Sequence, residues 1–288
     1  TSDVNATPVV PGGGNALSFD GTDDDVVIEN NLDVFSNSSY TINFFFNANG
    51  QSGSELIGKT LVSKAKPTPN LDGWAVFITQ DNGGQLLFVY TANGGTAYLR
   101  GPTVSSFADN NWHNVTITYS SAQNNAKFYL DGVLHETANT FGSDNLDSNI
   151  DIFLGKDRQS SSTSYFKGKI DELAFWSNAL TEDEVTNIYN SGTALDVRTN
   201  SGDYSSTADL KGYWKMEDGN GTTLTDVSGY GNDGTIDGAS WTTGVSSTSY
   251  DNTPKLIDIT APAVPSGLSA TAGDEQVVLT WTANSESD

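Results

Sequence analysis

The sequence predicts an all-β protein, built as a two-sheet sandwich or jelly roll with one short helix. About a dozen segments of roughly four to eight residues alternate apolar and polar side chains, as strands with one buried face do. Asn-Gly, Asp-Gly and Gly-Gly pairs separate many of these segments at the short spacing of antiparallel turns. Only 181–192 has helix signals, and one helix cannot cover a parallel α/β sheet.

The predicted strands follow one another largely as hairpins. The clearest hairpin joins 73–79 to 86–91 through Asn82-Gly83, a pair that readily adopts the positive φ of a tight turn. The Gly/Ser-rich stretch 47–58 is a predicted loop. The other predicted strands are residues 16–19, 26–28, 40–46, 61–63, 96–100, 112–119, 126–130, 133–136, 150–154 and 166–176.

Residues 165–192 join the longest predicted strand to the helix. Apolar and polar positions alternate along the strand, with one slip at 171–172. Thr181 and Glu184 then have the spacing of a capping box, in which each side chain bonds the other residue's backbone N–H. Apolar residues follow at helical spacing, and Gly192 supplies a C-terminal stop.

The composition divides the chain into a large β domain, a small β unit and connecting segments. The small unit has only two or three plausible strands, too few to fold alone, so it either docks on the large domain or opens a second one. In order, we predict an entry linker (1–14), the jelly roll (15–192), a Ser/Thr-rich linker (193–208), the small unit (209–250), a proline-containing linker (251–264) and a partial module (265–288).

The chain is strongly acidic, with 36 acidic and 13 basic residues and a formal net charge of −23. Nucleic acids and anionic membranes attract basic surfaces, so we expect neither as a partner. Divalent cations fit this charge better, although it also serves simply to keep a surface soluble. Since cysteine is absent, stability must come from packing and from any bound metal.

The sequence shows no sign of membrane insertion. No apolar run approaches the roughly 18 residues that a membrane span requires. Thr1-Ser2-Asp3 lacks the basic and apolar regions of a signal peptide. Abundant Ser, Thr, Asn, Asp and Gly with few basic residues are typical of extracellular or cell-surface bacterial proteins, and we expect that location after removal of a signal.

Two acidic loops are candidate calcium sites. The first loop holds or adjoins five carboxylates, of which a solvated turn explains three: Asp20, Asp23, Asp24, Asp25 and Glu29. Asp20 is the candidate ligand, because it stands beside Gly21 and a carboxylate near free backbone carbonyls is the ordinary ingredient of a calcium site. Asp226 and Asp233 lie in a second loop of Asp, Gly and Asn. Such loops are often plain turns, so both interpretations stay open there.

Several motifs together resemble the laminin G-like, concanavalin A-like jelly-roll domains of bacterial surface proteins. The resemblance covers about residues 15–190 in order and implies a jelly-roll fold. PAVPSGLSAT and VVLTWTA near the C-terminus resemble the first two strands of a fibronectin type III module. The motifs of the larger resemblance are ALSFDGTDD, WHNVTITY, KFYLDGVL, IFLGKD, FKGKIDELAFWSNALTEDEV and GYWKMEDGNGTTLTDVSGYGNDGTIDGASW.

The resemblance also implies a structural calcium ion. Related domains bind it with a carboxylate of the last long strand and oxygens near the first strand, and Asp171 and Asp20 stand at those positions here. The alternative is that Asp171 caps a turn or pairs with Lys167 or Lys169.

The residues argue against catalysis. Laminarinase-type relatives carry an E-x-D-x-E-like run, whose carboxylates project from one strand into a cleft, and this sequence has none. Glu182, Asp183 and Glu184 open the helix, where acidic residues favour the helix dipole. His113 and His135 are the only histidines, and we expect His113 at the surface or in a turn.

Binding is the function that remains. Jelly rolls of this family typically bind glycans or mediate adhesion, and a sugar site needs an exposed aromatic ring with polar side chains beside it. A structural spacer that binds neighbouring surface-protein subunits is the first alternative, and an accessory domain of a polysaccharide-degrading enzyme is the second. The candidate ligand residues are Trp74, Tyr98, Arg100, Asn70, Asp72, Asp157, Arg158 and Tyr165.

Overall fold

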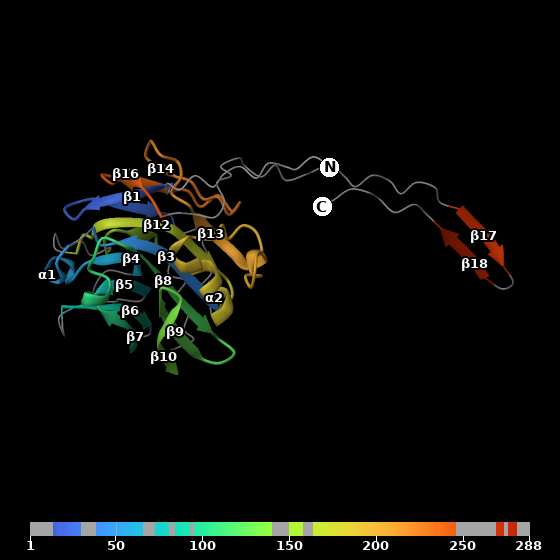
Figure 1. Ribbon diagram of the computed structural model, residues 1–288, viewed down its shortest axis with the longest axis horizontal. Coiled ribbons are helices and arrows are strands. Elements are labelled where there is room, and N and C mark those ends of the chain that lie inside the picture. The colour runs from blue at the N-terminus through green and yellow to red at the C-terminus, as the bar shows by residue number, and fades with distance from the viewer. Residues whose placement is uncertain are drawn as a thin grey trace. The chain divides into compact units, whose positions relative to one another are not determined.

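The chain forms two compact units, Thr1–Tyr250 and Asp251–Asp288 (Figure 1). In the second unit, β17 (Ser269–Gly273) pairs antiparallel with β18 (Gln276–Thr280), within the segment that resembles a fibronectin type III module. The rest of that segment lies outside the described residues. The computed structural model describes the backbone of these two strands and residues 14–29, 39–49, 51–65, 73–80, 84–92, 95–139, 150–157 and 164–245.

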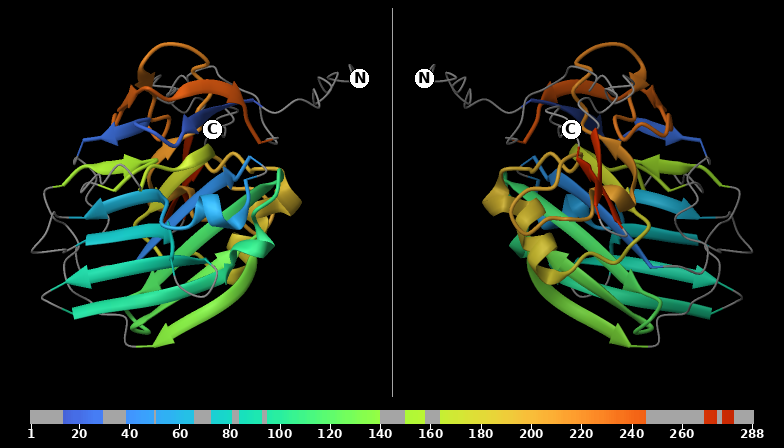
Figure 2. Two further views of the ribbon diagram at one scale, coloured as in Figure 1. Left: turned by 90° about the vertical axis from the view of Figure 1, so that its left-hand side faces the viewer. Right: turned by 90° about the vertical axis from the view of Figure 1, so that its right-hand side faces the viewer.

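The first unit consists of two eight-stranded sheets, which pack as layers (Figure 2). Their pairings are antiparallel, so the predicted all-β, two-sheet jelly-roll sandwich is confirmed. Sheet A has the order β10 (Val133–Asn139), β9 (Asn125–Leu130), β8 (Trp112–Ser120), β3 (Tyr40–Asn47), β12 (Lys167–Trp176), β1 (Asn15–Asp20), β16 (Ser240–Thr243), with β13 (Leu210–Trp214) also paired to β12. Sheet B has the order β14 (Thr223–Leu224), β15 (Gly234–Asp237), β2 (Asp25–Ile28), β11 (Ile152–Leu154), β4 (Thr60–Ala65), β5 (Gly73–Ile78), β6 (Gln85–Ala92), β7 (Gly95–Thr103).

The main core lies between the sheets and follows the two-residue period of the strands. In β3, Ile42, Phe44 and Phe46 point into this core and are fully buried. The intervening side chain of Phe45 is buried on the opposite face of sheet A, against Ala194 and Val245. The centre of sheet A is therefore buried on both faces, because a further layer covers its outer side there, whereas edge strand β10 is largely exposed.

That further layer is helix α2 (Glu182–Tyr189) with the segment that follows it (Figure 1). The capping box is present: the Thr181 hydroxyl accepts from the Glu184 backbone N–H at 3.2 Å, and the Thr181 N–H donates to the Glu184 carboxylate at 3.0 Å. The helix ends at Tyr189, and Asn190 rather than Gly192 provides the left-handed C-terminal residue.

Residues 193–208, where we predicted a linker, instead pack on sheet A. Tyr204 is buried, and its hydroxyl accepts from the Trp176 indole N–H and donates to the Val197 carbonyl, both at 2.9 Å. Val197 and Tyr204 belong to the apolar cluster beneath α2. The segment is polar in composition, but its few apolar residues are the ones that face the protein.

The helices are short. A one-turn helix, α1 (Gly53–Leu56), occurs in the stretch predicted as a loop, and 3-10 turns occur at Val104–Ser106, Asn190–Gly192 and Thr207–Asp209. Within the described part of the chain, none of the helices has both the length and the apolar character to span a membrane.

The strands of residues 209–250 complete the sandwich. β13 pairs with β12, β15 pairs with β2, and β16 pairs with β1, so the segment contributes to both sheets. Trp214 and Met216 are buried in the main core. Of the two alternatives for this segment, the structure has the strands docked on the jelly roll.

Candidate functional site

The outer face of sheet B carries the aromatic and basic residues expected for ligand binding. Cross-strand pairing places Tyr98, Val89, Ala75, Ser63 and Phe153 in one row across five strands. With about 4.8 Å between strands, the row is about 19 Å long. Tyr98 lies at one end of it, on edge strand β7, and its side chain is 44% exposed.

A second row beside the first contains Arg100, Leu87 and Phe77. The Arg100 side chain is 56% exposed, and its guanidinium lies 4.0 Å from the Glu136 carboxylate. Phe77 and Val89 are partly exposed, although both are apolar. We call Ala75, Phe77, Leu87, Val89, Tyr98 and Arg100, which lie on the outer side of these strands, the β5–β7 face; within it, Ala75 and Leu87 are buried, at 9% and 5% exposure.

Trp74, the predicted aromatic platform, is not part of this face. Its side chain is 1% exposed and packs in the main core against Phe88 and Phe175, with ring centroids 6.1 and 6.0 Å away. The alternation of β5 explains this position, because Trp74, Val76 and Ile78 share the inward face. The prediction of Trp74 as a ligand residue was therefore wrong.

Asp157 and Tyr165 lie toward the other side of sheet B. Tyr165 forms a bridge with Thr60 of β4, and the Asp157 carboxylate is 3.4 Å from the Ser164 hydroxyl. Thr60 continues the row of Arg100, Leu87 and Phe77, so about 19 Å separates Tyr165 from Arg100. The structure therefore does not bring Asp157 and Tyr165 together with Tyr98 and Arg100. Asn70, Asp72 and Arg158 lie outside the described residues.

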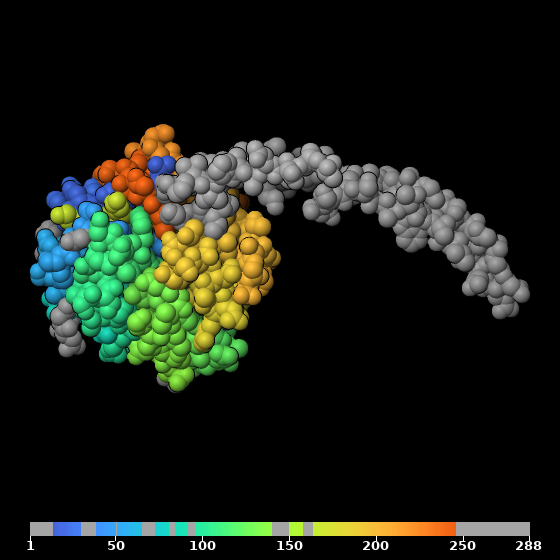
Figure 3. Space-filling view, in the orientation of Figure 1, coloured from blue at the N-terminus to red at the C-terminus, as the bar shows by residue number. Residues whose placement is uncertain are grey.

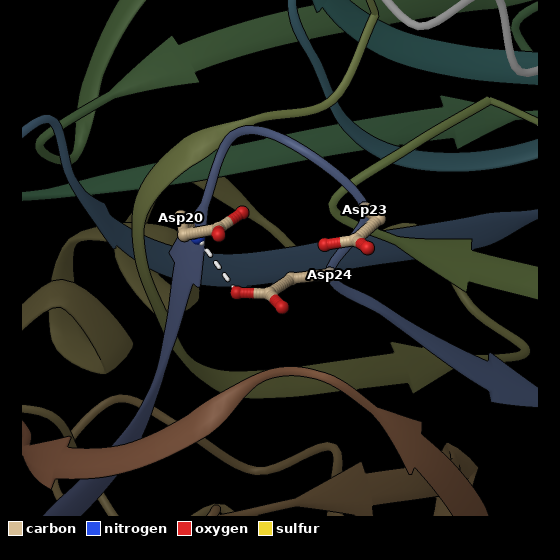
Figure 4. A group of neighbouring side chains, drawn as sticks. All are labelled: Asp20, Asp23 and Asp24. Carbon is tan, nitrogen blue, oxygen red and sulfur yellow. Dashed lines mark hydrogen bonds between the residues drawn. The ribbon is translucent and has the colours of Figure 1, made fainter.

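The turn between β1 and β2 gathers Asp20, Asp23 and Asp24 (Figure 4). One carboxylate oxygen from each lies within 4.8 Å of the others, a spacing compatible with oxygens around a calcium ion at 2.3–2.6 Å. The Asp24 carboxylate also accepts from the Asp20 backbone N–H at 2.7 Å. Burial raises the pKa of Asp24, opposed by that hydrogen bond and assisted by the charges of its acidic neighbours. A cation would offset this repulsion, so the residues fit calcium.

Asp171 lies apart from this turn. Asp20 pairs with Lys167, so Asp171 is four residues, about 13 Å, further along β12. Its carboxylate is buried and accepts the backbone N–H groups of Glu172 at 2.9 Å and Val245 at 2.8 Å. The predicted joint site of Asp20 and Asp171 does not form, because the strand register separates them.

Asp226 and Asp233 organise a loop. The Asp226 carboxylate accepts the backbone N–H groups of Tyr213, Ser228 and Asn232 and the Asn232 side-chain amide, all at 2.9–3.0 Å. Asp233 accepts the Asp226 N–H at 2.8 Å. Four donors use the lone pairs that a cation would need, so the geometry favours a turn over the cation site that we predicted.

A buried acidic centre escaped the sequence analysis. Glu172 follows Asp171 at the irregularity in β12, has φ +53° and is 3% exposed. Burial raises the pKa of Glu172 to about 8, against the opposing effects of Lys215 and of the Tyr213 hydroxyl that donates to it. Burial and the charge of Glu172 likewise raise the pKa of Asp171 well above its usual value. The slip in alternation at 171–172 was the available signal.

His113 was predicted at the surface or in a turn, but it is buried and lies within strand β8. Its ring is 8% exposed and lies between two carboxylates, with Nδ1 2.8 Å from Asp131 and Nε2 3.2 Å from Asp109. Burial alone would lower the pKa of His113, but the hydrogen bonds and charges of the two aspartates raise it. The histidine thus links two loops at the end of β8.

Sequence comparison identifies the family of this fold. Residues 20–186 match the concanavalin A-like lectin/glucanases superfamily. The chain belongs to this superfamily. The match extends from Asp20 into helix α2 and therefore includes strands β2 to β12, among them the strands of the β5–β7 face. A search of curated proteins finds no match to the chain.

Solved structures of similar fold include one described as a carbohydrate-binding protein and one described as a pentraxin. A candidate carbohydrate-binding protein from Bacteroides ovatus has 16% identity and a TM-score of 0.52, covering 82% of this chain and 62% of its own length. A heptameric SAP-like pentraxin from Limulus polyphemus has 13% identity and a TM-score of 0.51, covering 81% of this chain and 95% of its own. At these identities the likeness shows the superfamily's fold alone.

Proposed function

We propose that the chain is a non-catalytic glycan-binding module and that the β5–β7 face is its binding surface. The observation that carries this proposal is the contrast between the sheets. A layer containing α2 buries the outer face of sheet A, whereas sheet B presents Tyr98, Val89 and Phe77 partly to solvent. An apolar, aromatic surface beside polar groups is suited to a sugar ring, which has an apolar face and a rim of hydroxyls.

The polar groups for the hydroxyls are at the same edge of the sheet. Arg100 and Tyr98 project from alternate positions of β7, and Glu136 of β10 lies beside Arg100. A guanidinium and a carboxylate together donate and accept hydrogen bonds, as vicinal hydroxyls require. The superfamily membership and the carbohydrate-binding description of the Bacteroides structure agree with this assignment.

The acidic groups give no comparable support for catalysis. Asp171 and Glu172 adjoin on one strand, but they are 1% and 3% exposed and a substrate cannot reach them. Glu182 and Asp183 stand in the first turn of α2, and Glu184 there is held by Thr181 and by Ser205 and Ser206. We therefore place the chain among binding modules of extracellular or cell-surface proteins.

A glycan array tests the proposal. We expect binding by the wild-type protein and a loss of about fivefold or more for Tyr98→Ala, since a stacked aromatic ring contributes about 1–3 kcal/mol. Tyr230→Ala is the matched control, because Tyr230 is 58% exposed but lies in the loop after β14. Equal affinities of the two variants would refute the site.

If the wild-type protein bound no glycan on the array, glycan binding itself would be refuted. Concentration-dependent assembly in size-exclusion chromatography would then favour the structural spacer. Binding of a glycan that an adjoining catalytic domain degrades would instead indicate an accessory domain.

We also propose that calcium stabilises the module at Asp20, Asp23 and Asp24. The proposal rests on their converging oxygens and on the buried position of Asp24. Calcium at about 100 times its dissociation constant would add about 2.7 kcal/mol to the free energy of unfolding. Thermal unfolding with calcium or chelator measures this, and Asp23→Asn should reduce the difference. Identical curves for the wild-type protein would refute the site.

A further inference from the structure

A polar cavity lies over helix α2, on the side of the sandwich opposite the β5–β7 face. Its volume is about 500 Å³, and it is open to solvent, since Asp183, Asn190 and Asp203 of its lining are exposed. The surface of α2 adjoins that of the β9–β10 hairpin here, gold beside yellow-green in Figure 3. Its walls are the turn 131–133, the outward side of α2 with the residues that follow it, and Asp203.

The fold builds two of these walls through local conformation. Asp183, Asn187 and Asn190 are four and three residues apart, so they share one side of the helix axis and line the cavity together. The turn approaches the helix at Gly132, where φ is +73°, and a Cβ there would lie 3.2 Å from the Tyr189 ring. A left-handed glycine therefore lets the hairpin close against α2.

The cavity is acidic without an opposing base. Asp131, Asp183 and Asp203 line it, and no Lys, Arg or His is among its lining residues. Asp131 is held by the His113 ring and by the Asn114 N–H at 2.8 Å, which leaves Asp183 and Asp203 as the carboxylates available to a ligand. Burial and the charge of Asp131 raise the pKa of Tyr189, so its phenol stays neutral.

The three carboxylates of the cavity do not have the spacing of a metal site. In the described chain, the group that meets the spacing for a metal ion is Asp20, Asp23 and Asp24, and the cavity aspartates do not. A bare metal ion is therefore not the cation that this spacing favours. The amides of Asn187 and Asn190 and the hydroxyls of Thr186 and Ser191 supply hydrogen-bonding groups between them.

We propose that the α2 cavity binds a sugar bearing a free, protonated amino group. The ammonium would lie between Asp183 and Asp203, the ring would face Tyr189, and the hydroxyls would meet the amide and hydroxyl groups. A lysine side chain suits the cavity less well, because its four-carbon stem needs apolar walls and Val133 is the one aliphatic lining residue. This site is independent of the β5–β7 face.

Isothermal titration with two probes tests the inference: a glucosamine trimer and its fully N-acetylated counterpart, at pH 6 and physiological salt. Acetylation removes the charge but keeps the ring, so we expect the acetylated trimer to bind at least about tenfold more weakly, or 1.4 kcal/mol. The double variant Asp183→Asn/Asp203→Asn should weaken the glucosamine trimer by a similar factor.

Glu182→Gln is the matched control. Glu182 precedes Asp183 in the first turn of α2 and carries the same charge, but it pairs with Lys127 and does not line the cavity. We expect it to bind the glucosamine trimer as the wild-type protein does, and likewise Tyr98→Ala. If Glu182→Gln weakened the binding of the glucosamine trimer as much as the double variant does, the binding would reflect only the general attraction of a cation to an acidic protein. That result would overturn the site.

Three other results would also overturn the inference: equal affinity for both trimers, unchanged affinity in the double variant, or no binding of the glucosamine trimer. Loss of binding in Tyr98→Ala would assign the amino sugar to the β5–β7 face instead. Failure of the glycan array would leave the cavity standing, because the two sites are altered by different substitutions.

Discussion

Replacing Glu172 with glutamine should make the protein more stable at alkaline pH. Glutamine keeps the size of the side chain and an oxygen that can accept from the Tyr213 hydroxyl, but it cannot ionise. Glu172 is 3% exposed beside Asp171, so its negative charge is costly in the folded state. The substitution removes that cost and preserves the packing.

The size and sign of the effect follow from the pKa. Glu172 loses its proton near its ordinary value of 4.5 in the unfolded chain, and its pKa is about 8 in the fold. Folding therefore takes up a proton between these values. The stabilisation is complete below pH 4.5 and is lost as the pH rises through about 8. The difference of about 3.5 units between the two pKa values of Glu172 corresponds to a loss of about 5 kcal/mol of folding stability at most when the side chain ionises.

Urea denaturation at pH 5, 7 and 9 measures the free energy of unfolding of both proteins. We expect Glu172→Gln to equal or fall slightly below the wild-type protein at pH 5 and to exceed it by several kcal/mol at pH 9. Titrating groups remote from this centre are common to both proteins and cancel in the difference. Asp171 does not cancel: the charge of Glu172 raises its pKa, so removing that charge adds to the gain in stability at high pH. Glu182→Gln, an exposed charge removal, should show a difference that does not vary with pH. A constant difference for Glu172→Gln as well would refute the reasoning.

Three further substitutions test the roles assigned above. Trp74→Ala should lower the free energy of unfolding by about 3–5 kcal/mol, as loss of a core aromatic does, and a folded variant of unchanged stability would contradict its core position. Asp226→Ala should lower the free energy of unfolding by about 2–3 kcal/mol, equally with calcium and with chelator. A loss of stability seen only in the presence of calcium would instead support the predicted cation site at Asp226 and Asp233. Thr181→Ala should cost about 1 kcal/mol in thermal unfolding through the lost helix cap, and Thr181→Ser should retain most of that stability.

The sheets and helix could be predicted because their signals are local. Strand alternation depends on the two faces of each strand, and the capping box of Thr181 and Glu184 involves one turn of chain. The layer of residues 193–208 could not be predicted in this way. Its contacts, such as that between Trp176 and Tyr204, join positions 28 residues apart, and its composition is that of a linker.

The candidate sites were harder for a related reason. The local pattern of β5 does not show which side faces the core, so Trp74 was assigned to the ligand and Phe77 was missed. Asp20 and Asp171 do lie on paired strands, but the register that separates them is a property of the whole sheet. The carboxylates nearest Asp20 come from its own turn, where the sequence already placed them.

The covering layer on sheet A determines where each kind of ligand can bind. Because Trp176, Tyr204 and Tyr213 form an apolar cluster beneath α2, that side leaves for ligands the polar outer surface of the helix and its cavity. On sheet B, Tyr98 is 44% exposed and Phe77 and Val89 are partly exposed, so these side chains can meet a sugar ring. The two sides therefore differ in charge: Tyr98 lies beside Arg100, whereas Asp183 and Asp203 face no base. Tyr98→Ala and the double aspartate variant should consequently separate neutral from cationic ligands in a single protein.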